Sequence, residues 1–509
     1  MQKHLSRAAA GFEALGPRAT VFLGSLLLSL VAAQRGTINR DGMFYVEIAR
    51  NFLEGGFAAA YGIFHWPFLG ILMAVVSQVT GLGLEASGHV LNALFLAGAC
   101  ALLVACAGRL FPEAVWPIGL VLLALPGFNA YRDEMLREYG TWFFVMLSFW
   151  LALRWSDRPR WLSALAVQLS LVAATLFRTE ALAFFLALIL WQAFEAPAGE
   201  RWRRLVMIGG LPVIGLATLL AIYVAGQFGA GRLARDFGRF SVERFNAKAL
   251  AMAPAIAPAV VDYARDQART ILFFGSLAIV PLKFVGKAGI FILPLLYAFR
   301  DQSLRATLGR CRMFAWAFLV YFLVLCVHVL DLQFISGRHT GLLLAFAAPL
   351  TGYGLWQLMQ RFPAWKIPMV LLALLVMAAN VVSLGPAKRQ FVEAGGWLAN
   401  NASDSPRVYI ESPRAAYYAG WRFTERPMPE NRSGLAPGLE QGKYDLVVLE
   451  VSRKEPAIEP LLSDLKLAEV ARFAHPNGDA VIVARPLSAP AQDKASNTAE
   501  MRAKPAARE

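Results

Sequence analysis

The feature that most constrains the fold is a series of apolar runs, each close to the length that crosses a lipid bilayer. A membrane-spanning helix needs about 20 such residues, with some tolerance. With 57% hydrophobic and only 17% charged residues, the chain has more apolar surface than one water-soluble core can bury. The sequence therefore predicts a polytopic α-helical membrane protein. The runs lie near 20–34, 88–107, 113–130, 139–153, 161–177, 181–195, 205–226, 313–330, 340–358 and 367–385.

The net charge of +14 does not indicate a nucleic-acid partner. The lysines and arginines are dispersed in short groups between the apolar runs, as in loops that flank membrane helices. We therefore expect membrane lipids, and no nucleic acid, around this chain. The four cysteines lie in or beside apolar runs without a metal-binding spacing, and we expect them to be core residues.

Two further apolar stretches, 65–81 and 270–299, are ambiguous by length alone. The positive-inside rule decides them, because basic clusters close to helix ends face the cytoplasm. All five clusters share one side only if 65–81 is an interfacial or re-entrant helix and 270–299 crosses once. This layout has about eleven spans and a cytoplasmic amino terminus, with 20–34 as an uncleaved first helix. The basic clusters lie at 3–18, 154–160, 201–204, 300–312 and 361–366.

On this layout the segments on the far side are 35–87, 131–138, 178–180, 227–269, 331–339 and everything after about 386. Residues 41–53 place Phe44, Ile48 and Phe52 at helical spacing, which predicts an amphipathic helix on the membrane surface.

The carboxy-terminal region changes character, because proline and charge return. Short β-rich runs lie at 407–411, 444–451 and 480–484, residues 476–479 are typical of a hairpin turn, and helical stretches lie near 388–400, 413–420 and 457–465. We therefore expect a transmembrane domain over 1–385, a small extracytoplasmic α/β domain over 386–487 and a disordered tail over 488–509.

Four charged groups on the far side are candidates for chemistry, since charge beside hydrocarbon is costly. They are Asn39 to Asp41, Arg132 to Glu138, Arg178 with Glu180, and His328 to His339. Each has a structural alternative. Asp41 could cap a helix instead of forming a site. The residues Arg132 to Glu138 could form a solvated salt-bridge cluster. Arg178 and Glu180 could form a structural ion pair. An arginine such as Arg338 suits a phosphate contact.

One observation favours a functional site. The membrane layout follows from the basic clusters alone, and it places all four charged groups on the same side of the membrane. A cavity of acids and arginines at the membrane surface suits a ligand with a lipid tail and an anionic head. The acids can bind a divalent cation or act as general base, and the arginines can neutralise a departing phosphate.

The sequence resembles the GT-C superfamily of polyprenyl-phosphate-sugar-dependent glycosyltransferases. The resemblance is to the bacterial branch with the lipid A aminoarabinose and lipopolysaccharide-core galacturonosyl transferases, and the protein O-mannosyltransferases are more distant. It covers most of the membrane part. Its motifs are Asp41 after the first span, the amphipathic helix, the Pro-led helix at His65, Trp66 and Pro67, the cluster between the next two spans, and Arg338 opening a late span.

The resemblance implies roles for these positions. Asp41 becomes the catalytic base or a metal ligand, Glu134 or Glu138 the second acid, and Arg137 and Arg338 phosphate contacts. The metal would be magnesium or manganese, held by Asp41 and Glu134. The family's Glu-x-Arg-x-Tyr is stretched here, which leaves the choice between the two glutamates open. Further residues expected to bind the substrates are Arg40, His65, Arg132, Arg178, Glu180 and His339.

The activity implied is an inverting transfer of a sugar from a polyprenyl phosphate to lipid A, lipopolysaccharide, another glycan or protein. It would take place on the periplasmic face of the bacterial inner membrane. The alternatives are a lipid-linked sugar transporter or flippase, and a polymerase or ligase of surface polysaccharide. The segment 227–269, with Arg232, Arg235, Arg239 and Arg244, fits either a basic lid or a peripheral loop at the headgroups.

Overall fold

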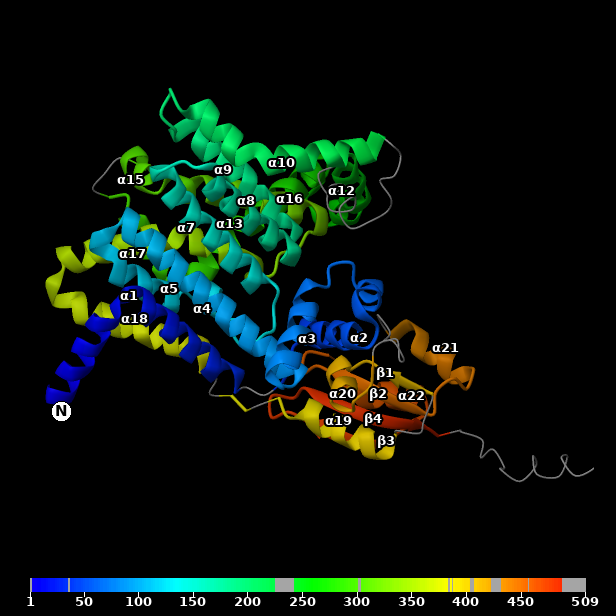
Figure 1. Ribbon diagram of the computed structural model, residues 1–509. Coiled ribbons are helices and arrows are strands. Elements are labelled where there is room, and N and C mark those ends of the chain that lie inside the picture. Colours follow the sequence, from blue (N-terminus) through cyan, green and yellow to red (C-terminus); the bar gives the residue numbers. More distant parts are fainter. Residues whose placement is uncertain are drawn as a thin grey trace, which may run out of the picture. The chain divides into compact units, whose positions relative to one another are not determined.

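The computed structural model describes residues 2–34, 37–224, 242–300, 304–382, 385–386, 388–402, 407–422, 432–455 and 457–487. The predicted tail, 488–509, lies outside them. The chain divides into two compact units (Figure 1). The helical unit comprises Met1–Arg35 and Phe44–Leu384, and the C-terminal unit comprises Gly36–Met43 and Gly385–Glu509.

Every predicted span of the helical unit is met by a helix, and the run 113–130 is divided at Pro126. The principal helices are α1 (Gln2–Ala33), α2 (Arg40–Ile63), α3 (Phe68–Thr80), α4 (Leu84–Leu110), α5 (Val115–Ala124), α6 (Pro126–Asn129), α7 (Glu138–Asp157), α8 (Trp161–Phe177), α9 (Ala183–Glu195), α10 (Arg201–Val224), α12 (Val242–Ile256), α13 (Ala268–Ala288), α14 (Ile292–Tyr297), α15 (Leu304–Arg310), α16 (Arg312–Leu332), α17 (Gly341–Arg361) and α18 (Lys366–Val381).

Among the described residues, six helical segments are long and apolar enough to cross a membrane. They are Leu15–Ala33, Leu84–Leu110, Asp262–Tyr297, Arg312–Leu332, Gly337–Arg361 and Pro363–Val381. Together with the small sheet of the C-terminal unit, they confirm the predicted class of a polytopic helical membrane protein with a small α/β domain. The count of eleven crossings stays a prediction.

Local sequence explains where helices break. Leu125 precedes Pro126 and takes an extended backbone, which ends α5. The helix α3 starts directly after Pro67 and stops at Gly81, whose φ of 74° suits the left-handed cap. The predicted amphipathic helix 41–53 is longer than expected, since α2 continues to Ile63 through a break at Gly56.

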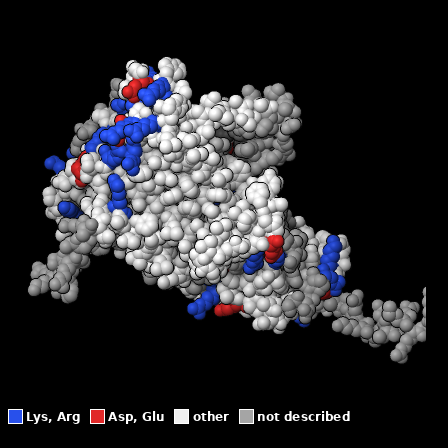
Figure 2. All heavy atoms as spheres, in the orientation of Figure 1, with Lys and Arg blue, Asp and Glu red and all other residues white. Residues whose placement is uncertain are grey.

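Three of the basic clusters, 154–160, 201–204 and 300–312, meet at one end of the helical unit, which we call the basic end. Ion pairs and hydrogen bonds join residues from the ends of different helices there. Figure 2 shows visible charges crowded near α15 and the start of α10, while the flank of the bundle is almost free of them. The contacts are Arg109 with Asp157, Arg310 with Glu113 at 2.7 Å, Arg312 with Glu195, and Arg204 with the Ser156 carbonyl oxygen at 3.1 Å.

The predicted far-side segments of the helical unit also meet. Glu138 at the start of α7 pairs with Arg178 after α8 and with Arg338 before α17. Lys248 of α12 pairs with Asp331 near the end of α16. The helices therefore run between two charged ends, as the layout requires. This grouping is confirmed, and the compartment that each end faces stays a prediction.

Close packing at α17 holds the centre of the bundle. This helix is the most enclosed of the six candidate spans. A Cβ at Gly354 would lie 1.8 Å from the Pro294 carbonyl oxygen of α14, and one at Gly352 would lie 2.4 Å from Ile118 of α5. Glycine is required at both positions because only a bare backbone allows these helices to approach so closely. The four cysteines are free thiols, three of them buried, as expected of core residues.

The C-terminal unit is a three-layer α/β structure. Its sheet has the order β1-β2-β4-β3, with β1 parallel to β2 and the other neighbours antiparallel. The strands are β1 (Val408–Ile410), β2 (Leu446–Val451), β3 (Leu467–Ala474) and β4 (Ala480–Pro486), and the helices are α19 (Gln390–Asn401), α20 (Pro413–Tyr418), α21 (Leu435–Glu440) and α22 (Ile458–Asp464).

Alternation along β2 explains the two faces of this sheet. Leu446 and Val448 pack toward α19 and α20, whereas Val447 and Leu449 pack toward α21 and α22. The predicted strands and helices of this region are present, and the hairpin turn contains Gly478 with a φ of 96°. The strand β3 and the helix α21 were not among the predicted elements.

The sequence did not predict that 36–43 belongs to the C-terminal unit. Ile38 is 1% exposed, and its backbone N–H donates to the Tyr418 hydroxyl of α20 at 2.9 Å. The first residues of α2, including Asp41, are thus part of the C-terminal unit.

The layout predicts that the C-terminal unit is extracytoplasmic. A reporter fused after Gly385 that is active only in an oxidising compartment should be active, because ten further crossings follow the first helix. A matched fusion after Arg158, at the basic end, should be inactive. The reverse pattern would contradict the layout.

Candidate functional site

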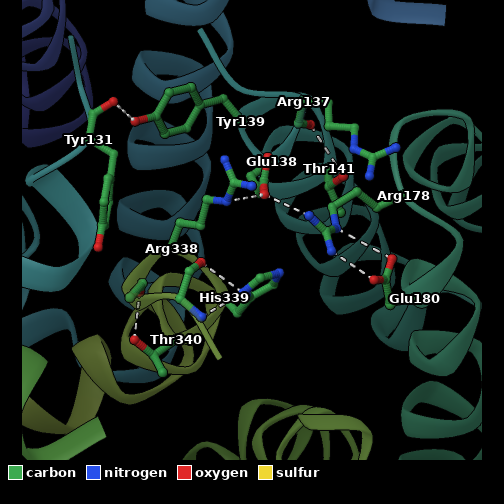
Figure 3. A network of polar contacts seen from close by, with 12 residues as sticks. Tyr131, Arg137, Glu138, Tyr139, Thr141, Arg178, Glu180, Arg338, His339 and Thr340 are labelled. Atoms are coloured by element: carbon green, nitrogen blue, oxygen red, sulfur yellow. Dashed lines mark hydrogen bonds and ion pairs between the residues drawn. The ribbon is translucent and has the colours of Figure 1, made fainter. Parts of the chain in front are cut away.

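The candidate site is a cluster of three arginines and two glutamates at the end of the helical unit opposite the basic end. We call Arg137, Glu138, Arg178, Glu180 and Arg338 the arginine cluster. Figure 3 shows these side chains converging from α7, from the short helix Thr179–Leu182 and from the short helix Gly337–Thr340. The cluster unites three of the four charged groups that the sequence singled out.

Arg178 is the central residue of the cluster. Its Nη1 lies 2.6 Å from Glu138 Oε1, and its Nη2 lies 2.7 Å from Glu180 Oε1. Arg338 Nε lies 3.3 Å from the same Glu138 oxygen. The Glu138 side chain is only 5% exposed and that of Arg178 11%, so one buried carboxylate holds two arginines in place.

The local backbone structure explains why these side chains lie close together. Glu138 is the first residue of α7, where a negative charge is favoured by the helix dipole. Arg178 has an extended backbone between α8 and the next short helix, which turns its side chain across the start of α7. Arg338 follows Ser336, whose hydroxyl lies 2.8 Å from His339 Nδ1 in a capping box. His339 therefore helps to fix the turn that carries Arg338.

Glu180 stays ionised in this setting. Burial alone would raise its pKa, but the Arg178 guanidinium, through charge and hydrogen bonds, and then Arg137 hold the pKa of Glu180 well below its usual range. A carboxylate in this state is a partner for cations and a poor proton acceptor at neutral pH.

The cluster carries an excess of positive charge. Three arginines face two carboxylates, and Lys287 of α13 adds a further cation beside Gly337. A Cβ at Gly337 would lie 2.5 Å from the Lys287 side chain and 2.2 Å from the Tyr131 hydroxyl. Glycine at 337 therefore lets this lysine approach the turn before Arg338. In the sequence, Lys287 is a charge within the apolar stretch 270–299, and this pattern alone does not indicate a site.

Arg137 has capacity left for a ligand. Within the part of the chain that the structure describes, its buried Nε and Nη1 have no hydrogen-bond partner. Its guanidinium lies over the Phe64 ring, 5.6 Å from the centroid. Buried donors without acceptors are costly, and an anionic oxygen placed there would satisfy them.

Arg132 lies inside the bundle and not in the arginine cluster. It is 4% exposed, and the hydrogen bonds of its side chain to described residues go to α6 and α1. Its acceptors are the Asn129 side chain on α6 and the Ser25 and Ser29 hydroxyls on α1. Arg132 therefore joins α1 to α6. Residues 131–137 are also turns rather than the expected helix.

Glu138 contacts both Arg178 and Arg338 directly. Another predicted residue, His65, lies apart from these ion pairs. His65 is exposed and its ring packs edge-on against Tyr61 at 4.8 Å. Its neighbour Trp66 donates to the Thr175 carbonyl oxygen at 2.8 Å, which ties the loop before α3 to the end of α8.

Asp41 and Arg40 belong to the C-terminal unit. Asp41, which was expected as a possible helix cap, lies within the first turn of α2, where its charge is favoured by the helix dipole, and the Asn39 carbonyl oxygen accepts from the Met43 N–H at 3.1 Å. Arg40 lies on the wall of a cavity in that unit.

A divalent cation does not fit the arginine cluster. Among the described residues, no group of three or more histidine, cysteine, aspartate or glutamate side chains lies together in a metal-binding arrangement. Both glutamates of the cluster already bind arginine. No step proposed below therefore uses a metal at this cluster.

The described part of the predicted lid is tied to the bundle. Arg244 Nε lies 2.8 Å and Lys248 Nζ 2.9 Å from Asp331 Oδ1, which is 2% exposed as a side chain. These pairs hold α12 beside the end of α16. The other three arginines, Arg232, Arg235 and Arg239, lie outside the described residues.

The cluster predicts that Glu138 stabilises the fold. Glu138→Gln should lower the free energy of unfolding by about 3 kcal/mol, because two arginines lose their buried counter-charge. Equilibrium unfolding in mixed micelles measures this. The control is Glu200→Gln, which breaks an exposed pair with Arg204 and should cost less than about 1 kcal/mol. Equal losses in the two variants would contradict the central position of Glu138.

No family model and no curated protein matches the chain. Among solved structures, it is similar to ArnT from Cupriavidus metallidurans in the apo state, with 14% identity and a TM-score of 0.43 over 94% of this chain and 98% of that one. It is also similar to the same protein bound to undecaprenyl phosphate, with 13% identity and a TM-score of 0.41 over 91% and 97% of the chains. At these values the similarity assigns no residue role and no substrate.

Proposed function

We propose that the protein is a membrane glycosyltransferase that moves a sugar from a polyprenyl-phosphate donor to a hydroxyl of a cell-envelope acceptor. The observation that carries this proposal is the arginine cluster, with its excess of positive charge and the unpartnered Nε and Nη1 of Arg137. A group with several anionic oxygens matches these donors.

A phosphate on a lipid suits the cluster for two reasons. Guanidinium groups bind phosphate oxygens bidentately, and arginine remains charged when it is partly buried. The cluster also lies at helix ends, at the depth where a lipid headgroup would lie if its tail enters the bilayer. We infer that Arg137 and Arg338 contact the phosphate, with Arg178 held behind them by Glu138 and Glu180.

The proposed reaction is a single displacement. The acceptor hydroxyl oxygen attacks the anomeric carbon, and the bond from that carbon to the phosphate oxygen breaks. The electron pair leaves with the polyprenyl phosphate, whose growing charge the arginines stabilise. We propose that Asp41 takes the proton of the acceptor hydroxyl, which is the role that the resemblance to the GT-C superfamily implies for it. Attack opposite the leaving group inverts the anomeric configuration.

The glutamates of the cluster have a positioning role in this proposal. Glu138 and Glu180 each bind an arginine at 2.6–2.7 Å, and a carboxylate between guanidinium groups is a weak base. The choice between Glu134 and Glu138 stays open, and Glu138 is in direct contact with both Arg178 and Arg338. We propose that it presets Arg178 and Arg338 for the phosphate.

The position of the charges supports transfer over transport. A carrier of lipid-linked sugars is expected to place charged residues near the middle of the bilayer. The described ion pairs that join different helices, such as those of Arg310 with Glu113 and Arg338 with Glu138, instead lie at helix ends. We propose the inner membrane of a bacterium as the location, and lipid A, lipopolysaccharide, another glycan or a protein as the class of acceptor.

Transfer by purified protein tests the proposal. With a radiolabelled polyprenyl-phosphate sugar and envelope lipid acceptors, Asp41→Asn should lower kcat by roughly 10²-fold or more, because the acceptor loses its base. Arg203→Gln, at the basic end, is the control and should leave the rate unchanged. Undiminished transfer by Asp41→Asn would contradict the assigned base. Movement of the lipid across the bilayer without any transfer would support a flippase instead.

A further inference from the structure

A cavity in the C-terminal unit has no part in the proposed reaction so far. It has a volume of about 780 Å³, which lies in the range of small-ligand sites. Its walls come from Arg40, from the start of α19, from the loop before α20, from the end of β2 and from the start of β4. All of these belong to the same compact unit.

Four cationic side chains line the cavity, and two of them, Arg432 and Arg414, already form ion pairs with glutamates of the same unit. Arg432 pairs with Glu411 at 2.9 Å and with Glu455 at 3.2 Å. The Arg414 guanidinium lies over the Phe391 ring, 3.5 Å from the centroid, and one of its Nη atoms binds Glu450 at 3.0 Å.

The other two cations, Arg40 and Lys388, have exposed side chains at the rim. Neither has an ion-pair partner among the residues that the structure describes. An anionic group of a ligand would therefore meet two free positive charges at the mouth of the cavity.

Deeper groups of the cavity retain unused hydrogen-bonding capacity. Gln390 is 3% exposed, and its Oε1 has no partner among the described residues. The same holds for Arg414 Nε and Glu450 Oε2. Two acceptors and one donor are thus left unsatisfied, which is costly unless a ligand with hydroxyl groups occupies the cavity.

We propose that this cavity binds a sugar that carries an anionic substituent, a phosphate or a carboxylate. The ring hydroxyls donate to Gln390 Oε1 and Glu450 Oε2 and accept from Arg414 Nε, while the anionic group lies between Arg40 and Lys388. This inference rests on the proposed function in one respect, since it identifies the sugar as part of the glycosyl acceptor.

The place of Arg40 connects the cavity with the reaction. Arg40 directly precedes Asp41, the proposed base, and both lie in the segment 36–43 that the C-terminal unit holds. Tyr418 of α20 binds the backbone of that segment at Ile38. An acceptor sugar bound at Arg40 would therefore lie at the residue next to the proposed base. This gives the C-terminal unit a task, which is to present the acceptor.

Binding of simple sugars to the full-length protein in nanodiscs tests this inference without any donor. Glucose 1-phosphate and galacturonic acid are the two anionic probes, and glucose is the neutral one, each titrated by saturation-transfer NMR up to about 10 mM. At least one anionic sugar should bind roughly tenfold tighter than glucose. The preferred probe identifies the substituent.

Variants locate the site. Lys388→Glu should abolish the preference for the anionic sugar, whereas Lys443→Glu, an exposed lysine of the same unit outside the cavity, should retain it. Gln390→Leu should weaken binding of all three sugars while the unfolding midpoint is kept or raised, because it removes an unsatisfied buried oxygen. Equal binding of glucose, no saturable binding, or equal loss in Lys443→Glu would overturn the inference.

Transfer kinetics separate this inference from the proposed function. Lys388→Glu should raise the KM for the acceptor and leave the KM for the donor unchanged. A wild-type protein that binds the anionic sugar in the expected way but transfers nothing would contradict the proposed function and leave the cavity assignment standing.

Discussion

The contact of Glu138 with Arg178 and Arg338 is the interaction on which the candidate site depends. Each of the three residues comes from a different part of the chain, and each alone at the end of an apolar helix would be costly to bury. Together they compensate one another and join the start of α7, the end of α8 and the turn before α17. The same arrangement leaves positive charge in excess, which is the property that a phosphate site requires.

The charged residues that join different helices lie at the two ends of the helical unit, and the Glu138 contact lies at one of these ends. The basic end uses arginines in ion pairs between helix ends, such as Arg310 with Glu113. The opposite end concentrates arginine and glutamate within one half-buried cluster. Between them, close approaches such as that of Gly354 to α14 leave little room for charge.

Apolar periodicity and basic flanks were sufficient to predict the helices of the membrane part, the grouping of charged segments and most of the C-terminal unit. They could not rank the charged residues, because a structural arginine and a ligand-binding one look alike in a sequence. Arg132 proved to be hydrogen-bonded within the bundle, whereas Lys287 lay beside the cluster unrecognised. The link of 36–43 to the C-terminal unit depends on contacts more than 300 residues apart in sequence, such as that of Ile38 with Tyr418, which no local pattern encodes.

The central claim is that the arginine cluster recognises a lipid phosphate, and a comparison of two lipids tests it most directly. Native mass spectrometry of the purified protein should show a polyprenyl phosphate bound at least tenfold more tightly than the polyprenol of equal length, a difference of about 1.4 kcal/mol. Arg137→Gln should remove most of this preference, and Arg203→Gln should preserve it. Equal binding of the phosphate and the alcohol by the wild-type protein would contradict the account.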